Sequence, residues 1–505
     1  MRIPALFAGT TAVCLVAPLA AQDFNGDGFA DLATGAPTED LGGIPDAGTV
    51  HVLYGSPAGL VAAGTEFLTQ GMLGIDPDEP GDLFGAALTW GDFNADGFDD
   101  LVVGAPGETL VLGGDGIAWV LSGSPFGLLP PALPPLGFSM FGPFPMGPPN
   151  PGAAFAASLA AGDLNGDGFD DFVAGGPGLI SVFGMPGAGG AMAFFGAPFG
   201  FFAGAYLDQT IVPGGDVAEM GDMFGTALAI GDFNFDGMDD LAVGVPGEEF
   251  VAAVPDIGAV QIYPGVAAPV IGPGFLVHQD IAGILDVGEP GDALGMALAA
   301  GFFNPDPFED LAIGVPFEDI GATVDAGGLN VVYGSAASLT VAGNGFWSQA
   351  GTAEVPEFAD NYAAALASGD VNADGLGDLL IGIPGETVGA LAGAGMLGVK
   401  FGAAGGLPGA TVFATQNTGG IPNVSEAGDM FGFAVTSADY DANGTDDAAI
   451  GVPSEDFGAM VDGGGLQMVY LPFGILVNSF ITQDTAGMPD MVESGDGFGR
   501  ALAGR

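Results

Sequence analysis

Short apolar runs recur along the chain, and glycine, proline and aspartate separate each run from the next. Runs such as 49–54 and 101–106 are rich in valine and leucine and have the length of strands. Glycine (94 residues) and proline (38 residues) are abundant, and both are unfavourable inside helices. The pattern therefore predicts an all-β chain of many short strands joined by tight turns.

The runs fall into a repeating unit with four predicted strands. Segments 84–88, 101–106 and 49–54 exemplify the first, second and third strands of a unit, and the second ends in Gly-x-Pro. The fourth strand ends near a recurring glutamine, found at Gln70, Gln209, Gln279, Gln349, Gln416 and Gln483. Four short strands in one unit are typical of a blade of a β-propeller.

An aspartate-rich block marks each of the seven units. The blocks begin at Asp23, Asp92, Asp163, Asp232, Phe302, Asp370 and Asp439, with spacings of 69, 71, 69, 70, 68 and 69 residues. We therefore predict a seven-bladed β-propeller over 22–505, with a period of about 69 residues.

The two ends of this region predict that the ring is closed. The first unit starts at its block without the preceding strand, and segment 495–503 resembles that strand and nothing more. A C-terminal strand that completes the first blade would hide the sheet edges. An open solenoid would need capping repeats instead.

The block has the composition of a metal-binding loop. Oxygen-bearing side chains stand at positions 1, 3, 5 and 9, and glycine at position 6 permits a sharp turn. Such a set suits Ca²⁺, which takes six to eight oxygen ligands, whereas zinc prefers histidine and cysteine. An EF-hand would need glutamate at position 12, where Thr34 and Val103 stand in the first two copies. Aspartate-rich turns without a metal are the alternative.

Six copies of the block are complete, which predicts about six Ca²⁺ ions. Their ligands would be Asp23, Asn25, Asp27 and Asp31; Asp92, Asn94, Asp96 and Asp100; Asp163, Asn165, Asp167 and Asp171; Asp232, Asn234, Asp236 and Asp240; Asp370, Asn372, Asp374 and Asp378; and Asp439, Asp441, Asn443 and Asp447. The fifth copy keeps Asn304, Asp306 and Asp310 but has Phe302 at position 1 and Pro307 at position 6. We expect that copy to be empty or weak.

Charge and the N-terminal segment predict where the protein acts. The chain has 62 acidic and four basic residues, and such a surface repels nucleic acid and anionic lipid. Segment 1–21 has Arg2, an apolar run over 3–16, and small residues at Ala20 and Ala21, as in a signal peptide. The single cysteine, Cys14, lies inside it. We expect an exported protein without a transmembrane segment, located outside the cell, in the periplasm or on the cell surface.

These motifs resemble a known repeat. Phe-Gly, the aspartate block and then Gly-Ala-Pro, as at 35–37 and 104–106, are similar to the FG-GAP repeat of integrin alpha-subunit propellers. Here Gly-Gly-Pro at 175–177 and Tyr-Ala at 362–363 depart from the pattern. The resemblance implies seven blades with Ca²⁺ in the loops between the first two strands. It also implies an extracellular binding or adhesion module for a protein or glycan ligand.

The loops that join the second and third strands are acidic and allow two interpretations. Their acidic residues, including Glu39, Asp40 and Asp46, form either a site for a cation or basic ligand or a solvated rim. The Pro-, Phe- and Met-rich segment 125–150 is either a docking patch or an irregular edge.

His51 and His278 lie in apolar strands, so we expect no enzyme. A calcium-dependent polysaccharide lyase or hydrolase, or a structural cell-envelope protein, remains the alternative function.

Overall fold

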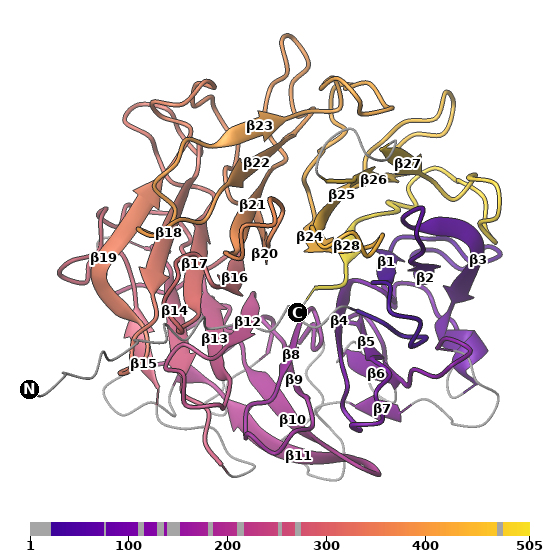
Figure 1. Cartoon of the computed structure of the whole chain (residues 1–505), viewed down its shortest axis with the longest axis horizontal. Helices are drawn as coiled ribbons and strands as arrows, with labels where there is room; N and C mark the ends of the chain where they lie inside the picture. The colour runs from indigo at the N-terminus through magenta and orange to yellow at the C-terminus, as the bar shows by residue number, and fades with distance from the viewer. Residues whose placement is uncertain are drawn as a thin grey trace, which may run out of the picture.

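The computed structural model describes residues 22–74, 77–109, 116–128, 136–138, 152–179, 185–209, 217–250, 255–267, 274–471 and 478–504. Four-stranded sheets are arranged as blades around a central axis (Figure 1). The predicted signal peptide and most of segment 125–150 lie outside the described residues. No helix in the described ranges is long and apolar enough to cross a membrane.

Each blade is an antiparallel sheet whose strands follow one another in sequence, except where the first blade takes its inner strand from the C-terminus. Blade 1 contains β28 (Ala501–Leu502), β1 (Leu32–Ala36), β2 (Thr49–Tyr54) and β3 (Val61–Leu68), followed by the 3-10 helix η1 (Gln70–Leu73). Blade 2 contains β4 (Ala87–Gly91), β5 (Asp100–Ala105), β6 (Ile117–Leu121) and β7 (Leu136–Phe138). Blade 3 contains β8 (Ser158–Gly162), β9 (Asp171–Gly175), β10 (Ala191–Ala197) and β11 (Gly200–Leu207).

The remaining blades repeat this order. Blade 4 contains β12 (Leu228–Gly231), β13 (Asp240–Val245), β14 (Ala259–Tyr263) and β15 (Phe275–Val277). Blade 5 contains β16 (Leu298–Gly301), β17 (Asp310–Val315), β18 (Gly328–Tyr333) and β19 (Thr340–Trp347). Blade 6 contains β20 (Ala365–Gly369), β21 (Asp378–Ile383), β22 (Met396–Lys400) and β23 (Val412–Ala414). Blade 7 contains β24 (Val435–Ala438), β25 (Asp447–Val452), β26 (Gly465–Val469) and β27 (Ser479–Ile481).

The ring closes as the sequence predicts. Strand β28 pairs antiparallel with β1, with Thr34 opposite Leu502 and Gly35 opposite Ala501. In Figure 1 the last strand accordingly lies beside the first, on the inner side of blade 1. The predicted all-β class and the seven blades are confirmed.

The boundary of the first strand differs from the prediction. We expected it over 84–88, but β4 begins at Ala87, and Phe84 and Gly85 precede it. Gly85 has a φ of 90°, a left-handed conformation that interrupts a strand. The Phe84 amide donates to the Ala47 carbonyl of blade 1 at 3.0 Å, and the Gly85 amide donates to Gly104 at 2.9 Å. Phe-Gly is therefore the junction between two blades, not the start of a strand.

The same junction explains why the second motif begins with glycine in every blade. A Cβ atom on Gly35, the first residue of Gly-Ala-Pro in blade 1, would lie 2.0 Å from the Gly85 carbonyl oxygen. Corresponding glycines face the next blade in the same way, with distances of 2.0–2.3 Å at Gly104, Gly175, Gly244, Gly314, Gly382 and Gly451. Glycine is thus required at this position of each blade, whereas the residue that follows it varies.

Apolar side chains fill the space between neighbouring blades. Val50 and Val52 of β2 belong to one buried cluster with Leu101, Val103 and other residues of blade 2. The second strand of every blade is buried along its whole length, as in β5, β13 and β25. Burial of this kind contributes about 25 cal/mol for each Å² of apolar surface. The core is therefore a ring of inter-blade layers that holds the loops at both faces in place.

Candidate metal sites and the two loop faces

The aspartate blocks lie at one face of the ring, at the start of the second strand of each blade. In blade 2 the block spans 92–99 between β4 and β5, and its position-9 residue, Asp100, is the first residue of β5. In blade 1 the block leads directly into β1. We call the face that carries these blocks, together with the loops between third and fourth strands, the hairpin-loop face. The other loops form the opposite face.

The position-1 carboxylate organises the backbone of its loop. One oxygen of Asp23 accepts the amides of Gly26 at 2.7 Å and Asp27 at 3.1 Å, and the other accepts that of Gly28 at 2.8 Å. Gly28 has a φ of 87°, which glycine adopts without strain. The bonds to positions 5 and 6 recur at Asp92, Asp163, Asp232, Asp370 and Asp439.

The position-9 carboxylate ties each loop to the end of the third strand. One oxygen of Asp31 accepts the Gly55 amide and the other accepts the Phe24 amide, both at 2.9 Å. Gly55 directly follows β2, so this bond brings the two loops of the hairpin-loop face together. The bond to the end of the third strand is present in every other blade, from Asp100, Asp171, Asp240, Asp310, Asp378 and Asp447.

Burial changes the acidity of the position-9 residues. Desolvation, reinforced by the charges of Asp23 and Asp27, raises the pKa of Asp31 to about 8. Burial is also the main cause that raises the pKa to about 8 in Asp100 and Asp171. A cation placed among the loop carboxylates would offset this repulsion, because an opposite charge favours the ionised form.

The donor atoms fit a hard cation. Carboxylate oxygens of Asp439, Asp441 and Asp447 all lie within 4.8 Å of one another. In blade 3 the side-chain oxygen of Asn165 is buried and has no hydrogen-bond partner among the described residues. Oxygen-only donors of this type match Ca²⁺, and when bound the ion would neutralise the loop carboxylates. The carboxylates predicted for the loop of blade 7 are thus brought together, and metal binding by the other five complete loops stays a prediction.

The altered fifth loop keeps its shape without the position-1 oxygen. Pro307 has no N–H, so the donor that a position-1 carboxylate satisfies in other loops is missing as well. Asp306 still accepts the Phe308 amide at 3.1 Å, and Asp310 accepts the Gly334 amide at 2.9 Å. The replacements at Phe302 and Pro307 are therefore compatible with each other, and together they remove one ligand oxygen.

Sequence reasoning missed a link that joins one loop to the next. The Asp23 amide donates to a carboxylate oxygen of Asp99 at 2.8 Å, and the Asp99 amide donates back to the Asp23 carbonyl at 3.2 Å. Asp99 is position 8 of the block in blade 2, next to the ligand Asp100. The same side-chain bond joins Asp92 to Asp170, Asp163 to Asp239, Asp232 to Glu309, and Asp370 to Asp446. The recurrence of an acidic residue at position 8 is the signal that could have revealed it.

On the opposite face, buried glutamines and acids meet at blade boundaries. Each recurring glutamine, which we used only to mark the end of a strand, donates its side-chain amide to a glutamate in the next blade. The pairs are Gln70–Glu108, Gln209–Glu248, Gln279–Glu318, Gln349–Glu386, Gln416–Glu455 and Gln483–Glu39. A buried aspartate two residues before each Phe-Gly position completes the set: Asp82, Asp222, Asp292, Asp360, Asp429 and Asp496. We call these sets the Gln–Glu–Asp clusters.

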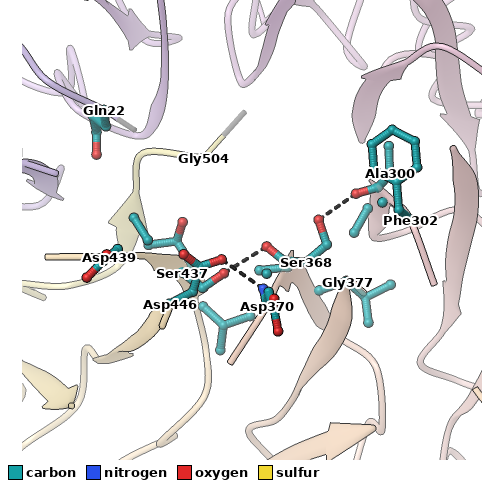
Figure 2. Close-up of a pocket in the computed structure, with 18 of the residues that line it drawn as sticks. Gln22, Ala300, Phe302, Ser368, Asp370, Gly377, Ser437, Asp439, Asp446 and Gly504 are labelled. Carbon is teal, nitrogen blue, oxygen red and sulfur yellow. Dashed lines mark hydrogen bonds between the residues drawn. The ribbon is translucent and has the colours of Figure 1, made fainter. Parts of the chain in front are cut away.

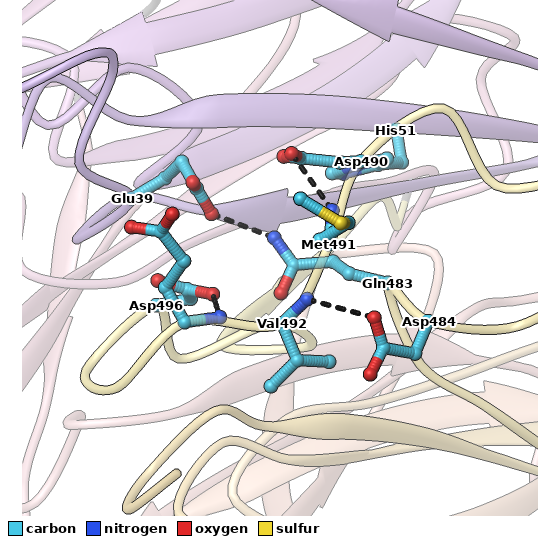
Figure 3. A network of polar contacts seen from close by, with 9 residues as sticks. Glu39, His51, Gln483, Asp484, Asp490, Met491, Val492 and Asp496 are labelled. Carbon is cyan, nitrogen blue, oxygen red and sulfur yellow. Dashed lines mark hydrogen bonds and ion pairs between the residues drawn. The ribbon is translucent and has the colours of Figure 1, made fainter.

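The clusters correct our expectation for the acidic loops of this face. Glu39 is 3% exposed, so it belongs to the interior and not to a solvated rim, whereas Asp40 and Asp46 are exposed. Asp40 accepts the Asp46 amide at 2.9 Å and thereby shapes the loop tip. Figure 3 shows Gln483 between Glu39 and Asp496, with its amide nitrogen directed at Glu39.

The centre of the ring holds a cavity of about 480 Å³ among the inner strands (Figure 2). Hydroxyl groups at its wall bridge neighbouring blades. Ser368 donates to the Ala300 carbonyl at 2.5 Å, and Ser437 donates to the Ser368 carbonyl at 2.7 Å. The loop residues Asp370 and Asp439 lie at its rim on the hairpin-loop face.

Both histidines lie in aromatic surroundings away from this cavity. His51 is fully buried between Phe67 and Phe498, with ring centroids 5.2 Å from each, and burial lowers its pKa to about 3. His278 stacks on Phe250 at 3.9 Å. Neither is among the described residues that line the cavity. His51 lies in β2, as its apolar context predicts, whereas His278 directly follows β15 and is half-buried.

Comparison with known proteins identifies the repeat. The sequence pattern of the FG-GAP repeat matches residues 16–53, 84–121, 155–190, 224–263 and 362–399. Integrin alpha-PS5 of Drosophila melanogaster is 32% identical over 171 residues, which cover 32% of this chain and 15% of that protein. Phosphatidylinositol-glycan-specific phospholipase D of Mus musculus is 39% identical over 88 residues, which cover 17% of this chain and 10% of that protein. The similarity thus spans only 10–15% of the length of these two relatives.

Among solved structures, a rhamnogalacturonan lyase of Bacillus licheniformis aligns with 85% of this chain and 68% of its own, at 10% identity and a TM-score of 0.37. A similarity this low bears on neither the fold nor the activity of the chain. The matched repeats, the junction of Phe-Gly with Gly-Ala-Pro and the ring of blades agree with one another. The chain is therefore a seven-bladed β-propeller in which five segments match the FG-GAP repeat, and part of it is similar in sequence to integrin alpha subunits.

Proposed function

We propose that this protein is an exported, calcium-binding propeller that acts as an extracellular binding or adhesion module. The observation that carries the proposal is that the two faces of the ring present different acidic groups. Six complete oxygen-ligand loops lie on the hairpin-loop face, while exposed acidic loop tips lie on the opposite face. Ca²⁺ in the first set would stabilise the fold, and the second set would be free to contact a ligand.

The charge balance supports the calcium part of the proposal. Lys400 and Arg500 are the two basic residues in the described part of the chain. Lys400 donates to the Gly409 carbonyl at 2.7 Å, and Arg500 lies 5.2 Å from the ring of Phe433. Neither of these two residues is bonded to a carboxylate of the six loops, and a bound cation would supply the compensating charge. The ligands would be those named for the complete loops, including Asp439, Asp441, Asn443 and Asp447.

The exposed loop tips support the binding part. Asp46, Asp256, Asp325 and Asp462 occupy the same position in four blades, each with a φ of 53–56°. The first, second and fourth of these are exposed, and Asp325 is half-buried. An aspartate tolerates this left-handed conformation better than most residues. Because the tips repeat around one face, they offer several equivalent acidic contacts to a protein or glycan, either directly or through a cation. Relatedness to integrin alpha subunits agrees with an extracellular ligand.

A binding screen tests the proposal. Purified protein would be applied to immobilised extracellular-matrix proteins and polysaccharides, in Ca²⁺ and in EGTA. We expect retention on at least one surface in Ca²⁺ and a loss of at least tenfold in the variant D46N/D256N/D325N/D462N, since asparagine keeps the backbone conformation and removes the charge. No retention in Ca²⁺, or equal retention by this variant, would contradict a ligand site at these tips.

A further inference from the structure

One of the Gln–Glu–Asp clusters brings three carboxyl groups close together at a blade boundary. At the boundary between blades 1 and 2, carboxylate oxygens of Glu79, Asp82 and Glu108 all lie within 4.8 Å of one another. Glu79 and Asp82 come from the connection between the blades, and Glu108 comes from the loop after β5. The Glu79 amide also donates to Asp82 at 2.7 Å, which fixes the connection around the cluster. This grouping lies on the face away from the hairpin loops.

Each cluster contains a buried oxygen that nothing in the described chain satisfies. The side-chain carbonyl oxygen has no hydrogen-bond partner among the described residues in any of the six glutamines: Gln70, Gln209, Gln279, Gln349, Gln416 and Gln483. These side chains are at most 2% exposed, so only a partner enclosed within the protein could satisfy the oxygen. A buried carbonyl oxygen without a hydrogen-bond partner destabilises the folded state. Six repetitions of the same unsatisfied atom indicate an absent partner that accepts oxygen ligands.

The clusters also bury carboxyl groups without a basic partner in the described chain. Burial and then the neighbouring Asp292 raise the pKa of Glu318 to about 9, and burial with Asp496 raises that of Glu39 to about 8. No basic residue contributes to either shift, and Lys400 and Arg500 make the contacts described above. Buried carboxylates need a compensating partner, which is either protons or a cation.

One blade boundary lacks the cluster altogether and serves as an internal control. Between blades 2 and 3, Ala153 occupies the aspartate position and Leu179 occupies the glutamate position, and both are buried. The backbone is unchanged. Gly178 donates to Ala153 and Gly189 donates to Leu179, both at 3.1 Å, just as Gly107 donates to Asp82 and Gly116 to Glu108 at 3.1 Å.

The fold therefore does not require polar groups at this position. Aspartate and glutamate are both present at six boundaries and both replaced by apolar residues at the seventh, as expected if they serve one ligand together. If the aspartate and the glutamate only formed hydrogen bonds to the backbone, they would not need to be replaced together.

We propose that the six Gln–Glu–Asp clusters bind hard divalent cations, with Ca²⁺ as the probe ion, and that these ions bridge neighbouring blades on the opposite face. The ligands are the glutamine side-chain oxygen and the glutamate and aspartate carboxylates, which suit an ion that prefers oxygen. None of these residues belongs to the hairpin loops. The clusters are therefore a second set of metal sites, and the binding function proposed above does not depend on them.

Native mass spectrometry of the full chain, with Ca²⁺ counted per molecule, tests this proposal. We expect more than seven ions in the wild type, which is more than one for each hairpin loop. The variant D292A/E318L, which copies the residues at Ala153 and Leu179, should lose one ion. The matched loop variant D232N/D236N should also lose one, and the combined variant should lose two. D292N/E318Q, which preserves side-chain volume, should lose one ion as well and provides the test if D292A/E318L does not fold.

The outcomes separate the two sets of sites. A wild-type count of seven or fewer, together with an unchanged count in D292A/E318L and D292N/E318Q, overturns the proposal and assigns protons to the clusters. If D232N/D236N loses an ion in that experiment, the calcium loops remain supported while the second set is rejected. If no variant loses an ion and the wild type binds none, both assignments are wrong.

Discussion

The carbonyl oxygen of Gly85 occupies the space that a side chain on Gly35 would need, because a Cβ atom there would lie 2.0 Å from it. This contact joins the Phe-Gly motif of one blade to the Gly-Ala-Pro motif of the blade before it. The two motifs are 50 residues apart in sequence but form a single inter-blade joint. The two motifs of the repeat are thus the residues through which neighbouring blades pack against each other.

Replacing a glycine at this joint should destabilise the whole ring. Gly244→Ala places a methyl group 2.0 Å from the Gly295 carbonyl, and overpacking of this kind costs about 1–3 kcal/mol. Gly405→Ala is the matched control, because no atom lies within 4 Å of its added Cβ and its φ is not in the left-handed region. Urea unfolding would compare the two variants with the wild type. Equal stability of Gly244→Ala and Gly405→Ala would contradict the joint.

The position-9 aspartates should contribute to stability through their backbone bonds even without a metal. Asp31→Ala leaves the amides of Gly55 and Phe24 without an acceptor, which costs about 2–6 kcal/mol for the two groups. Asp27→Ala removes one bond, from the Phe29 amide in an exposed part of the loop, and should cost much less. Unfolding in EGTA measures both effects. A larger effect of Asp27→Ala would show that the position-9 bonds are unimportant.

The altered fifth loop should gain a site when both replaced residues are restored. Phe302→Asp with Pro307→Gly supplies the position-1 carboxylate and the position-6 N–H that it binds in other loops, as Asp23 binds Gly28. We expect one additional Ca²⁺ per chain by calorimetric titration. Phe302→Asp alone should give a weaker site, since proline cannot adopt the left-handed conformation of position 6. A double variant that folds and binds no additional ion would contradict the assigned roles of these positions.

His51 should make stability depend on pH below the ordinary histidine range. Burial lowers its pKa to about 3 in the folded protein, so protons bind preferentially to the unfolded chain, where the pKa is about 6.5. Its contribution is present above pH 6.5 and is lost as pH falls toward 3. The groups facing it are Phe67, Phe498 and the Asp490 carboxylate at 4.0 Å from Nε2.

The comparison of wild type with His51→Phe isolates this effect from the many carboxyl groups. Between pH 6 and pH 4 the wild type should lose more stability than the variant, by up to about 1.4 kcal/mol per pH unit. Chemical unfolding at several pH values measures the difference. Parallel pH profiles of the two proteins would show that His51 is not held neutral by burial.

Local features of the fold were predictable from the sequence, and contacts between blades were not. The period, the third strand at 49–54 and the completion of blade 1 by the C-terminal segment follow from repetition and apolar patterning. The first strand was misplaced because Gly85 adopts a left-handed φ, which an apolar pattern does not reveal. Loop residues such as Asp92 and Asp100 could be predicted as ligands because they lie close together in one loop, and their binding of a metal stays a prediction.

Contacts between buried residues of different blades could not be predicted, because the residues are far apart in the sequence. Gln483 and Glu39 are 444 residues apart and meet only because the ring closes. Glu39 appeared as one of several acidic loop residues, although its burial separates it from Asp40. Alignment of the repeats against one another carries the missing signal, because glutamine, aspartate and glutamate recur at similar offsets from Phe-Gly and Gly-x-Pro and disappear together between blades 2 and 3.

The central claim, that Ca²⁺ in the hairpin loops stabilises the ring, is tested most directly by counting bound Ca²⁺ and measuring thermal unfolding with and without EGTA. We predict at least six ions per chain and a melting temperature lowered by more than about 10 °C in EGTA, because each bound ion adds its binding free energy to the folded state. No uptake of Ca²⁺ and a melting temperature unchanged by EGTA would contradict the claim.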